Sequence, residues 1–291
     1  MINYSLVMID LHTHSSASDG DLSPAELIAA AANQGLSAIA LTDHDTIKGL
    51  KSAEETASKY SIRFIPGIEM EIAWSAPQGE FHLLGLGLTR PSPAFLSAVD
   101  SLARSRETRN REILKRLNTL GIHADYEEVR SFSGGGSVGR PHFASLLISR
   151  GLVKSHELAF TRYLGRGKPL FVPKAVLEFD QAAGLIKESG GIAVLAHPMS
   201  LYISWGRLPD IVRDLKDRGL DGLEAWHPTA EPRSCKRLEA LGKSLGLYVT
   251  EGSDFHGKAR PERKLGHSAG DRKIADSVLE AIPELCPPLM S

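Results

Sequence analysis

Histidines and carboxylates repeatedly follow apolar, strand-like segments along this chain. The segments are residues 6–11, 38–42, 63–68, 192–196 and 247–250. The polar residues at or shortly beyond such segments are His12, His14, Asp19, Asp43, His44, Glu69, His82, His197, Asp254 and His256. A fold that gathers the carboxyl ends of its strands on one rim would bring all of these side chains together. The pattern therefore predicts an α/β protein with a barrel-type site.

The composition describes an ordinary globular protein and argues against several functions. The 291 residues are 42% hydrophobic and 24% charged, which suffices for a sizeable core. A formal net charge of −1 argues against a stable complex with long nucleic acid. Residues 1–11 lack a secretion signal, and no apolar stretch approaches the length of a membrane span. Cys235 and Cys286 cannot form a disulfide framework, so we expect free thiols in a cytoplasmic protein without a membrane partner.

Hydrophobic periodicity divides the chain into a β/α framework and a helical insertion. Residues 1–91 and 171–291 alternate strands with helices, whereas residues 92–170 are predicted to be helical. The insertion begins with a long helix over residues 93–120 that is rich in Arg and Lys. Strands are expected near residues 6, 38, 63, 81, 192, 222 and 247. The alternation implies parallel strands joined by right-handed crossovers.

The spacing of the polar residues suits a metal centre. Alternation along an extended strand points His12 and His14 to the same face, so both imidazoles can reach one ion. Asp254 and His256 repeat this spacing, and the carboxylate of Glu69 can bridge two cations where an imidazole cannot. Buried, unpaired charge is unfavourable, and coordination to a dication compensates it. Mixed His and carboxylate ligands favour Mn, Zn or Fe over Mg or Ca.

The order of the motifs resembles that of the polymerase and histidinol phosphatase (PHP) superfamily. The motifs are DLHTHS-x3-DG, LTDHD, PGIEME, HLLGL, AHP and GSDFH. The resemblance implies a distorted seven-stranded β/α barrel with two or three divalent metal ions. The stretches Gly139–Phe143 and Tyr163–Pro169 resemble a bacterial subgroup with a helical insertion in the barrel. Members of that subgroup hydrolyse nucleoside 3′,5′-bisphosphates and trim the 5′ ends of short RNA.

The resemblance also implies a role for each motif residue. One ion would be bound by His12, His14, Glu69 and Asp254, a second by Glu69, His82 and His197, and a third by Asp19, His44 and His256. Glu69, Asp254 and His197 would take part directly in catalysis, in which a metal-activated hydroxide attacks phosphorus. Asp43 has no assigned ion, and we expect it to orient a neighbouring ligand.

Substrate contacts are expected from the insertion. Arg140, His142 and Lys168 would hold phosphate groups, because Arg offers a bidentate fork and Lys a point charge. The subgroup usually carries a cation shortly after its barrel histidine, but residues 199–201 of this chain read Met-Ser-Leu. This departure leaves the exact nucleotide substrate open.

Several alternatives stay open at this point. His227 has no consistent counterpart in the family, and the cationic row on residues 93–120 is either a solvated face or a guide for RNA. A histidinol-phosphate phosphatase would not explain the GRPHF stretch, and a non-catalytic PHP module would not retain all nine ligands. An amidohydrolase acting on C–N bonds would show a bridging lysine past a central strand, and none is so placed.

Overall fold

A seven-stranded sheet forms the centre of the protein. The computed structural model describes residues 7–75, 79–133 and 136–285. The strands are β1 (Met8–Asp10), β2 (Leu36–Leu41), β3 (Arg63–Ile72), β4 (Phe81–Leu86), β5 (Ile192–Leu195), β6 (Gly222–Trp226) and β7 (Tyr248–Glu251). They lie side by side in the order in which they occur in the chain. All seven coincide with strands expected from the periodicity.

One strand departs from the predicted parallel arrangement. β4 is antiparallel to both β3 and β5, whereas every other neighbouring pair is parallel. The expectation of parallel strands throughout was therefore wrong at β4. The physical reason is the short link over residues 73–80, which can form a hairpin but is too short for a crossover helix. Because β4 runs in reverse, His82 near its start pairs with Glu71 near the carboxyl end of β3.

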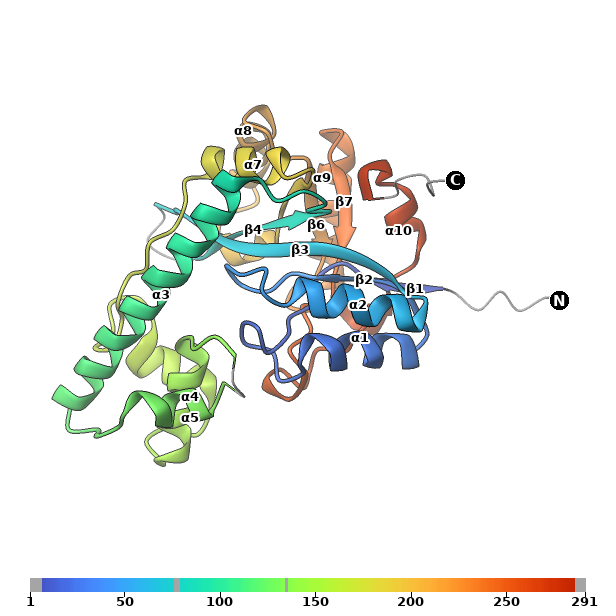
Figure 1. Cartoon of the computed structure of the whole chain (residues 1–291). Coiled ribbons are helices and arrows are strands. Elements are labelled where there is room, and N and C mark those ends of the chain that lie inside the picture. The colour runs from blue at the N-terminus through green and yellow to red at the C-terminus, as the bar shows by residue number, and fades with distance from the viewer. Residues whose placement is uncertain (1–6, 76–78, 134–135, 286–291) are drawn as a thin grey trace.

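Helices cover the sheet on its outer side (Figure 1). Helices α1 (Pro24–Asn33) and α2 (Leu50–Tyr60) pack against β2 and β3. Helix α7 (Phe179–Glu188) packs against β4 and β5, and α9 (Pro232–Ser244) packs against β6 and β7. Helix α8 (Leu208–Asp217) contributes Leu208, Val212 and Leu215 to the same apolar cluster as α7 and α9.

The other side of the strands forms a separate apolar cluster. Its members from β1 to β5 include Ile9, Ala38, Ala40, Ile65, Leu84, Leu86, Ile192 and Val194. Ile274, Leu279 and Ile282, from the segment around α10 (Ser277–Glu280), complete this cluster. Just beyond the strand ends, a parallel bridge joins Thr13, which follows β1, to Phe255, which follows β7. The first and last strands of the sheet are therefore linked at the rim where the predicted ligands lie.

Residues between β4 and β5 are mainly helical. They form α3 (Pro93–Thr119), α4 (Tyr126–Ser131), α5 (Arg140–Ser149), α6 (His156–Ala159) and a π-helical turn (Phe160–Leu164). Ile113, Phe143 and Leu147 belong to an apolar cluster that only this part of the chain supplies. Figure 1 shows α3 running away from the sheet, with α4 and α5 at its far end.

Two smaller expectations concern the cysteines and the membrane. Cys235 is buried and not in a disulfide, and Cys286 lies outside the described residues. Within the described ranges, no helix combines the length and the apolar character needed to cross a bilayer.

Candidate metal centre

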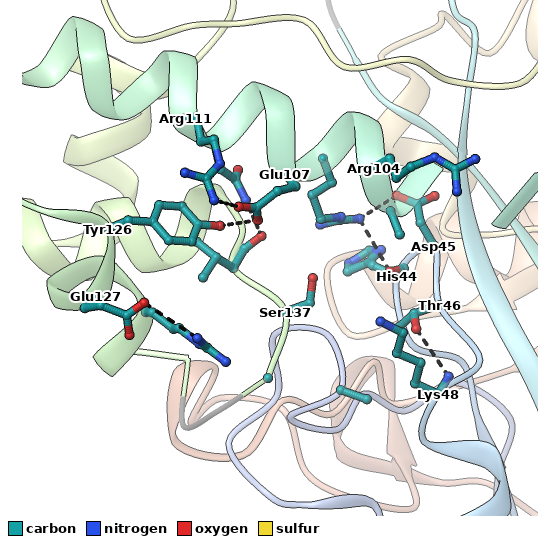
Figure 2. A pocket seen from close by; sticks show the side chains of 17 residues that line it. His44, Asp45, Thr46, Lys48, Arg104, Glu107, Arg111, Tyr126, Glu127 and Ser137 are labelled. Atoms are coloured by element: carbon teal, nitrogen blue, oxygen red, sulfur yellow. Dashed lines mark hydrogen bonds and ion pairs between the residues drawn. The ribbon is translucent and has the colours of Figure 1, made fainter. Parts of the chain in front are cut away.

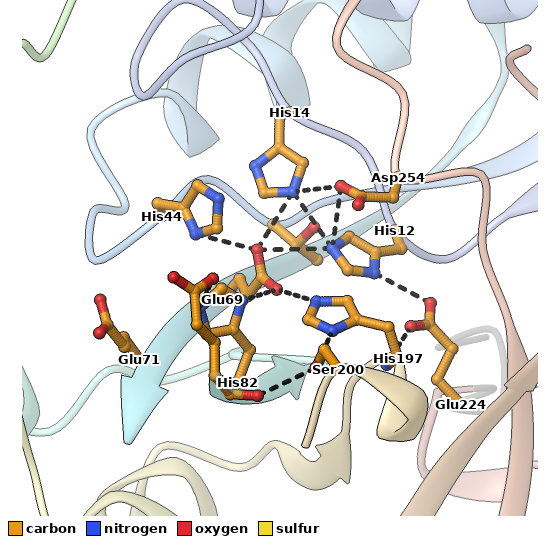
Figure 3. Close-up of polar contacts among 12 residues, drawn as sticks. His12, His14, His44, Glu69, Glu71, His82, His197, Ser200, Glu224 and Asp254 are labelled. Carbon is orange, nitrogen blue, oxygen red and sulfur yellow. Dashed lines mark hydrogen bonds and ion pairs between the residues drawn. The ribbon is translucent and has the colours of Figure 1, made fainter. Parts of the chain in front are cut away.

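All nine predicted metal ligands belong to adjoining groups that could hold a metal ion. Figure 3 shows seven of them together, namely His12, His14, His44, Glu69, His82, His197 and Asp254. His12 and His14 follow β1, Asp19 lies in the next loop, and His44 follows β2. The remaining ligands are Glu69 in β3, His82 in β4, His197 directly after β5, and Asp254 and His256 after β7. The five parallel strand ends and the start of the reversed β4 thus meet at one place.

Glu69 lies at the centre of this group. Its Oε2 atom is 2.9 Å from Nδ1 of His44 and 3.3 Å from Nε2 of His14. Its Oε1 atom is 2.9 Å from Nδ1 of His82 and 2.9 Å from Nε2 of His197. Nε2 of His12 is 3.5 Å from Oε2 as well, so a single carboxylate with only 1% exposure lies within 4 Å of five imidazoles, three near Oε2 and two near Oε1. This is the arrangement expected of a carboxylate shared by two cations.

A second group of donor atoms surrounds His12 and His14. Their Nε2 atoms lie 3.1 Å apart. Oδ1 of Asp254 is 3.1 Å from Nε2 of His14 and 3.5 Å from Nε2 of His12. Four electron-pair donors thus face one point between these side chains. They are Nε2 of His12, Nε2 of His14, Oδ1 of Asp254 and Oε2 of Glu69.

The third group lies on the side of the Asp19 loop. Nε2 of His256 is 3.3 Å from Oδ1 of Asp19, and Nε2 of His44 is 3.9 Å from Oδ2. The ligand atoms of His14, Asp19, His44 and His256 all lie within 4.8 Å of one another. His14 therefore joins a group that was predicted from only three residues.

The donor set fits divalent cations. Nδ1 of His14 is buried without a hydrogen-bond partner among the described residues, and Oε2 of Glu69, despite its short distance to His44, accepts no well-aligned hydrogen bond among them. A buried polar atom without a partner is costly, and a cation at these positions would compensate both atoms. Nitrogen and carboxylate oxygen together match Mn, Zn or Fe better than Mg or Ca.

Electrostatics within the cluster follow from burial and opposite charge. Burial opposes ionisation of Glu69, but His44, His82 and His12 outweigh it and hold the pKa of Glu69 well below its usual range. Burial likewise opposes protonation of His82, yet Glu69 raises the pKa of His82 to about 9. His82 therefore takes up a proton where cations are absent, and metal binding must displace that proton.

Glu224 is a site residue that the sequence did not reveal. This buried carboxylate lies in β6, with Oε1 2.9 Å from Nδ1 of His12. Its other oxygen accepts a hydrogen bond from the backbone N–H of His197 at 2.7 Å. Glu224 thereby fixes the tautomer that leaves Nε2 of His12 free for a cation. The only signal in the sequence was a lone carboxylate inside an otherwise apolar strand.

Arg263 was also missed, and the role of His227 had been left open. Nε2 of His227 lies 3.0 Å from Oδ2 of Asp254, and these two residues form a possible ligand group with His12. Arg263 forms an ion pair with the same Oδ2 atom of Asp254. His227 thus contacts the cluster, whereas the sequence had left its role open.

Asp43 acts on the loop that carries Asp19. It accepts hydrogen bonds from the backbone and side chain of Ser15 at 2.8 and 2.6 Å, and from the hydroxyl of Ser18 at 2.6 Å. It is buried and belongs to none of the ligand groups. This placement matches the orienting role expected for it.

Two ligands adopt left-handed backbone conformations. His197 has φ 28° and Asp254 has φ 50°, which are unfavourable for residues with a side chain. His197 lies two residues beyond the end of β5, and Asp254 lies three residues beyond the end of β7. Such strain at a polar cluster is typical of a functional site.

A cavity of about 480 Å³ lies over the ligand cluster, between the sheet and the helical region. Seven of the predicted ligands line it, together with the cationic residues Arg106, Arg109, Arg140, Lys174, Arg260 and Arg263. Lys174 contacts Asp45 and Glu71, neither of which was predicted to bind metal. Lys174 therefore lines the cavity but does not bridge the ligand groups, as the lysine of an amidohydrolase would.

The three predicted phosphate contacts have different positions. Arg140 lines the cavity, with its guanidinium 3.1 Å from Oε1 of Glu80. Nδ1 of His142 instead accepts a hydrogen bond from the backbone N–H of Gly139 at 2.8 Å, which caps helix α5. Lys168 is exposed and is not among the residues that line the cavity. Of the three, the structure brings only Arg140 to the cavity.

Arg109 is a buried cation of this cavity, and its guanidinium donates a hydrogen bond to Oδ1 of Asn110 at 3.4 Å. It is only 6% exposed, and its Nε atom has no hydrogen-bond partner among the described residues. Burial lowers the pKa of the Arg109 guanidinium to about 9, so it remains positive at neutral pH. A buried cation without a carboxylate partner, facing a cavity, is suited to bind an anion.

Comparison with known proteins identifies the family. The sequence model of the PHP domain matches residues 10–193, which is more than half of the chain. The chain belongs to the PHP family. The match includes the predicted ligands from His12 to His82, while His197, Asp254 and His256 follow it.

Relatives of known name share most of this PHP chain. A 5′-3′ exoribonuclease of Haemophilus influenzae is 36% identical over 247 residues, which are 85% of this chain and 89% of the relative. A 3′,5′-nucleoside bisphosphate phosphatase of Chromobacterium violaceum is 31% identical over 282 residues, which are 97% of this chain and 94% of the relative.

Solved structures share its fold. A Chromobacterium violaceum protein with bound sulfate, named an amidohydrolase, has a TM-score of 0.83 and 31% identity, and the match covers 94% of this chain and 96% of the other. A Bifidobacterium adolescentis protein assigned as a metal-dependent phosphoesterase has a TM-score of 0.81 and 26% identity, covering 95% and 96%. The PHP assignment thus holds for sequence and fold alike.

Proposed function

We propose that this PHP protein is a metal-dependent phosphoesterase that hydrolyses nucleoside 3′,5′-bisphosphates or short RNA. The nine predicted ligands would hold two or three divalent ions, with Mn²⁺ the best match to the donor set. When bound, such ions supply Lewis acidity and lower the pKa of a water molecule toward neutrality. The names of the two relatives support a nucleotide or RNA substrate.

The side chains of this protein would position the reacting phosphate group. Glu69, His197 and Asp254 are among the seven predicted ligands that line the cavity, so a phosphate group bound there would face them. Glu69 holds the ligand groups together through its two oxygens, and His197 is fixed from behind by Glu224 and by the hydroxyl of Ser200 at 2.9 Å. A rigid cluster of this kind keeps the reacting phosphate in one orientation.

One observation carries the proposed substrate class: the buried guanidinium of Arg109 faces the same cavity as the ligands. Arg140 lies on that wall as well, with its guanidinium 5.5 Å from the centre of the Phe160 ring. A substrate with two phosphates would place one at the ions and the other against these arginines. The sulfate in the related structure supports anion binding in this fold.

The fold is proposed to be a closed PHP-type barrel with residues 92–170 as an inserted domain. Closure is supported by the bridge from Thr13 to Phe255 and by the apolar cluster that β1 to β5 share. A separate helical domain is supported by the independent apolar cluster of α3, α4 and α5. Residues 1–91 and 171–291 would then form the barrel.

Phosphate release from a panel of substrates tests the proposed function. The panel contains a nucleoside 3′,5′-bisphosphate, the corresponding mononucleotide, a short 5′-phosphorylated RNA and histidinol phosphate, each with Mn²⁺, Zn²⁺ or Fe²⁺. We expect the bisphosphate or the RNA to be preferred, with Mn²⁺ as the best ion. Preference for histidinol phosphate would overturn the substrate assignment.

A further inference from the structure

A second cavity lies beside the metal centre, on the side of helix α3 that faces α4. It has a volume of about 680 Å³. Its walls are helix α3, helix α4, the segment from His44 to Lys48 and residues 136–138 (Figure 2). A volume of this size is in the range of sites for organic ligands.

The two cavities share part of their walls. His44 and Arg106 line both of them. His44 contacts Glu69 at 2.9 Å, so it belongs to the metal centre. Arg106 lies 3.4 Å from the carbonyl oxygen of His44 and forms an ion pair with Asp45. The two cavities are therefore neighbours, and His44 and Arg106 lie between them.

The walls of the second cavity are positively charged on balance. Lys48, Arg104, Arg106, Arg111 and Arg130 outnumber the carboxylates Asp45, Glu107 and Glu127. Lys48 and Arg104 have no carboxylate within 4.0 Å among the described residues. The whole chain carries a formal net charge of −1, so this concentration of cations is local. Local positive charge of this kind attracts phosphate groups.

Planar side chains lie next to these cations. Tyr126 lines the cavity, and the guanidinium carbon of Arg111 is 5.2 Å from the centre of its ring. The hydroxyl of Tyr126 donates to Oε2 of Glu107 at 2.6 Å, which fixes the ring. Aromatic rings and arginine planes are the groups on which unpaired bases stack, largely without regard to base identity.

We infer that the second cavity binds the nucleotides of single-stranded RNA that follow the phosphate held at the metal centre. The inference rests on the proposed function and narrows its substrate class. In a nucleoside 3′,5′-bisphosphate the 3′-phosphate is a monoester, whereas in RNA the same phosphate is a diester that carries the next nucleotide. With the 5′-phosphate against Arg109 and Arg140, only RNA needs a second space beyond the ions.

The reaction balances with water as the only co-reactant. Water adds to the phosphorus of the first phosphodiester, and the bond from phosphorus to the 3′ oxygen breaks. The 3′ oxygen takes up a proton and leaves with the first nucleotide, while the phosphate remains on the 5′ end of the shortened RNA. The shortened RNA is the product that occupies the second cavity.

The test compares two substrates in two matched double variants. Lys48→Glu with Arg130→Glu reverses two charges in the second cavity. Arg213→Glu with Lys236→Glu makes the same change in charge on α8 and α9, and the side chains of Arg213 and Arg130 are both 54% exposed. Each metal-loaded protein is assayed with a nucleoside 3′,5′-bisphosphate and with a 5′-phosphorylated RNA pentanucleotide that begins with the same nucleoside.

We expect kcat/KM for the pentanucleotide to fall by about tenfold or more in the cavity variant, whatever the base sequence. The value for the bisphosphate should stay within about threefold, and the control variant should match the unmodified protein on both substrates. With metal removed by a chelator, binding of the fluorescent pentanucleotide should also lose roughly 0.7 in its log–log salt slope for each phosphate contact removed.

Equal loss on both substrates, or no loss on the pentanucleotide, would overturn the inference. A protein that hydrolyses the bisphosphate but neither binds nor cleaves the pentanucleotide would also overturn it, while the proposed function would stand. If neither substrate were hydrolysed, the proposed function would fail. The inference would fall with it unless the chelated protein bound the pentanucleotide and lost that binding in the cavity variant.

Discussion

Oε1 of Glu224 lies 2.9 Å from Nδ1 of His12, and both side chains are buried. A carboxylate behind a metal-binding imidazole fixes the ring and raises its basicity, and removing it typically costs about 10- to 100-fold in metal affinity. We therefore expect Glu224→Gln to weaken metal binding by about that factor, measured by competition with a chelator.

The matched control for that substitution is Glu239→Gln. Glu239 also accepts a hydrogen bond from a β6 side chain, since Oε2 lies 2.8 Å from Nε1 of Trp226, but it has no contact with the ligands. Its loss should leave metal affinity unchanged. Equal metal affinities for Glu224→Gln and the unmodified protein would show that Glu224 does not position His12.

The pH dependence of stability should reverse when metal is removed. Burial opposes protonation of His82, but Glu69 prevails and raises the pKa of His82 to about 9. A raised pKa stabilises the folded state fully below the ordinary value near 6.5, and this stabilisation is lost as the pH rises through about 9. The melting temperature of the metal-free protein should therefore fall between pH 7 and pH 9.5.

Stabilisation of the protein by bound metal should have the opposite pH dependence, because protons compete with cations for the same histidine nitrogens. The rise in melting temperature on adding Mn²⁺ should be larger at pH 9 than at pH 7. His82→Gln should flatten the curve of the metal-free protein, while His123→Gln, at an exposed position, should not. A metal-free curve that is already flat in the unmodified protein would count against this electrostatic account.

Arg140 and Lys168 should differ in their effect on substrate choice. Arg140 lines the metal cavity and Lys168 does not. Arg140→Ala should lower kcat/KM for a nucleoside 3′,5′-bisphosphate by about 10- to 100-fold, the scale of one charge-assisted contact of roughly 1.5–3 kcal/mol. The value of kcat/KM for a mononucleotide should fall much less. Lys168→Ala should leave kcat/KM unchanged for both substrates. Equal loss on both substrates would make Arg140 structural.

Gly252 should tolerate no side chain. A Cβ atom there would lie 2.3 Å from Cβ of His12 and 2.7 Å from Oε1 of Glu224. Gly252→Ala should therefore displace His12, lower the metal content and destabilise the protein by about 1–3 kcal/mol. Gly184→Ala is the control, since no atom lies within 4 Å of a Cβ at that helical position. It should stabilise helix α7 by roughly 0.5–1 kcal/mol, and the same behaviour at Gly252 would refute the close packing.

The strands and the metal ligands were accessible from sequence because each depends on local pattern. Apolar runs located all seven strands, and the residue type and position of Glu69 predicted a shared carboxylate, whose two oxygens lie near different histidines. The reversal of β4 is a matter of chain length rather than of hydrophobicity, so the pattern of residues 81–86 could not indicate it.

Residues whose roles depend on tertiary contacts could not be predicted from the sequence. Glu224 resembles any polar residue in a strand until His12 and His197 are placed beside it. Lys174 reaches the metal cavity while Lys168, six positions earlier, is exposed, because the course of the intervening loop decides which side chain faces inward. Such differences depend on packing, which no residue motif records.

The most direct measurement of the central claim determines metal content and phosphate release on the same purified protein. Elemental analysis should find two or three divalent ions per chain, and phosphate release from a nucleoside 3′,5′-bisphosphate should disappear on chelation and return with Mn²⁺. Glu69→Gln should lower both metal content and rate, because its two oxygens lie within 4 Å of five of the histidines. Full phosphate release from a sample verified to contain no metal would contradict the account.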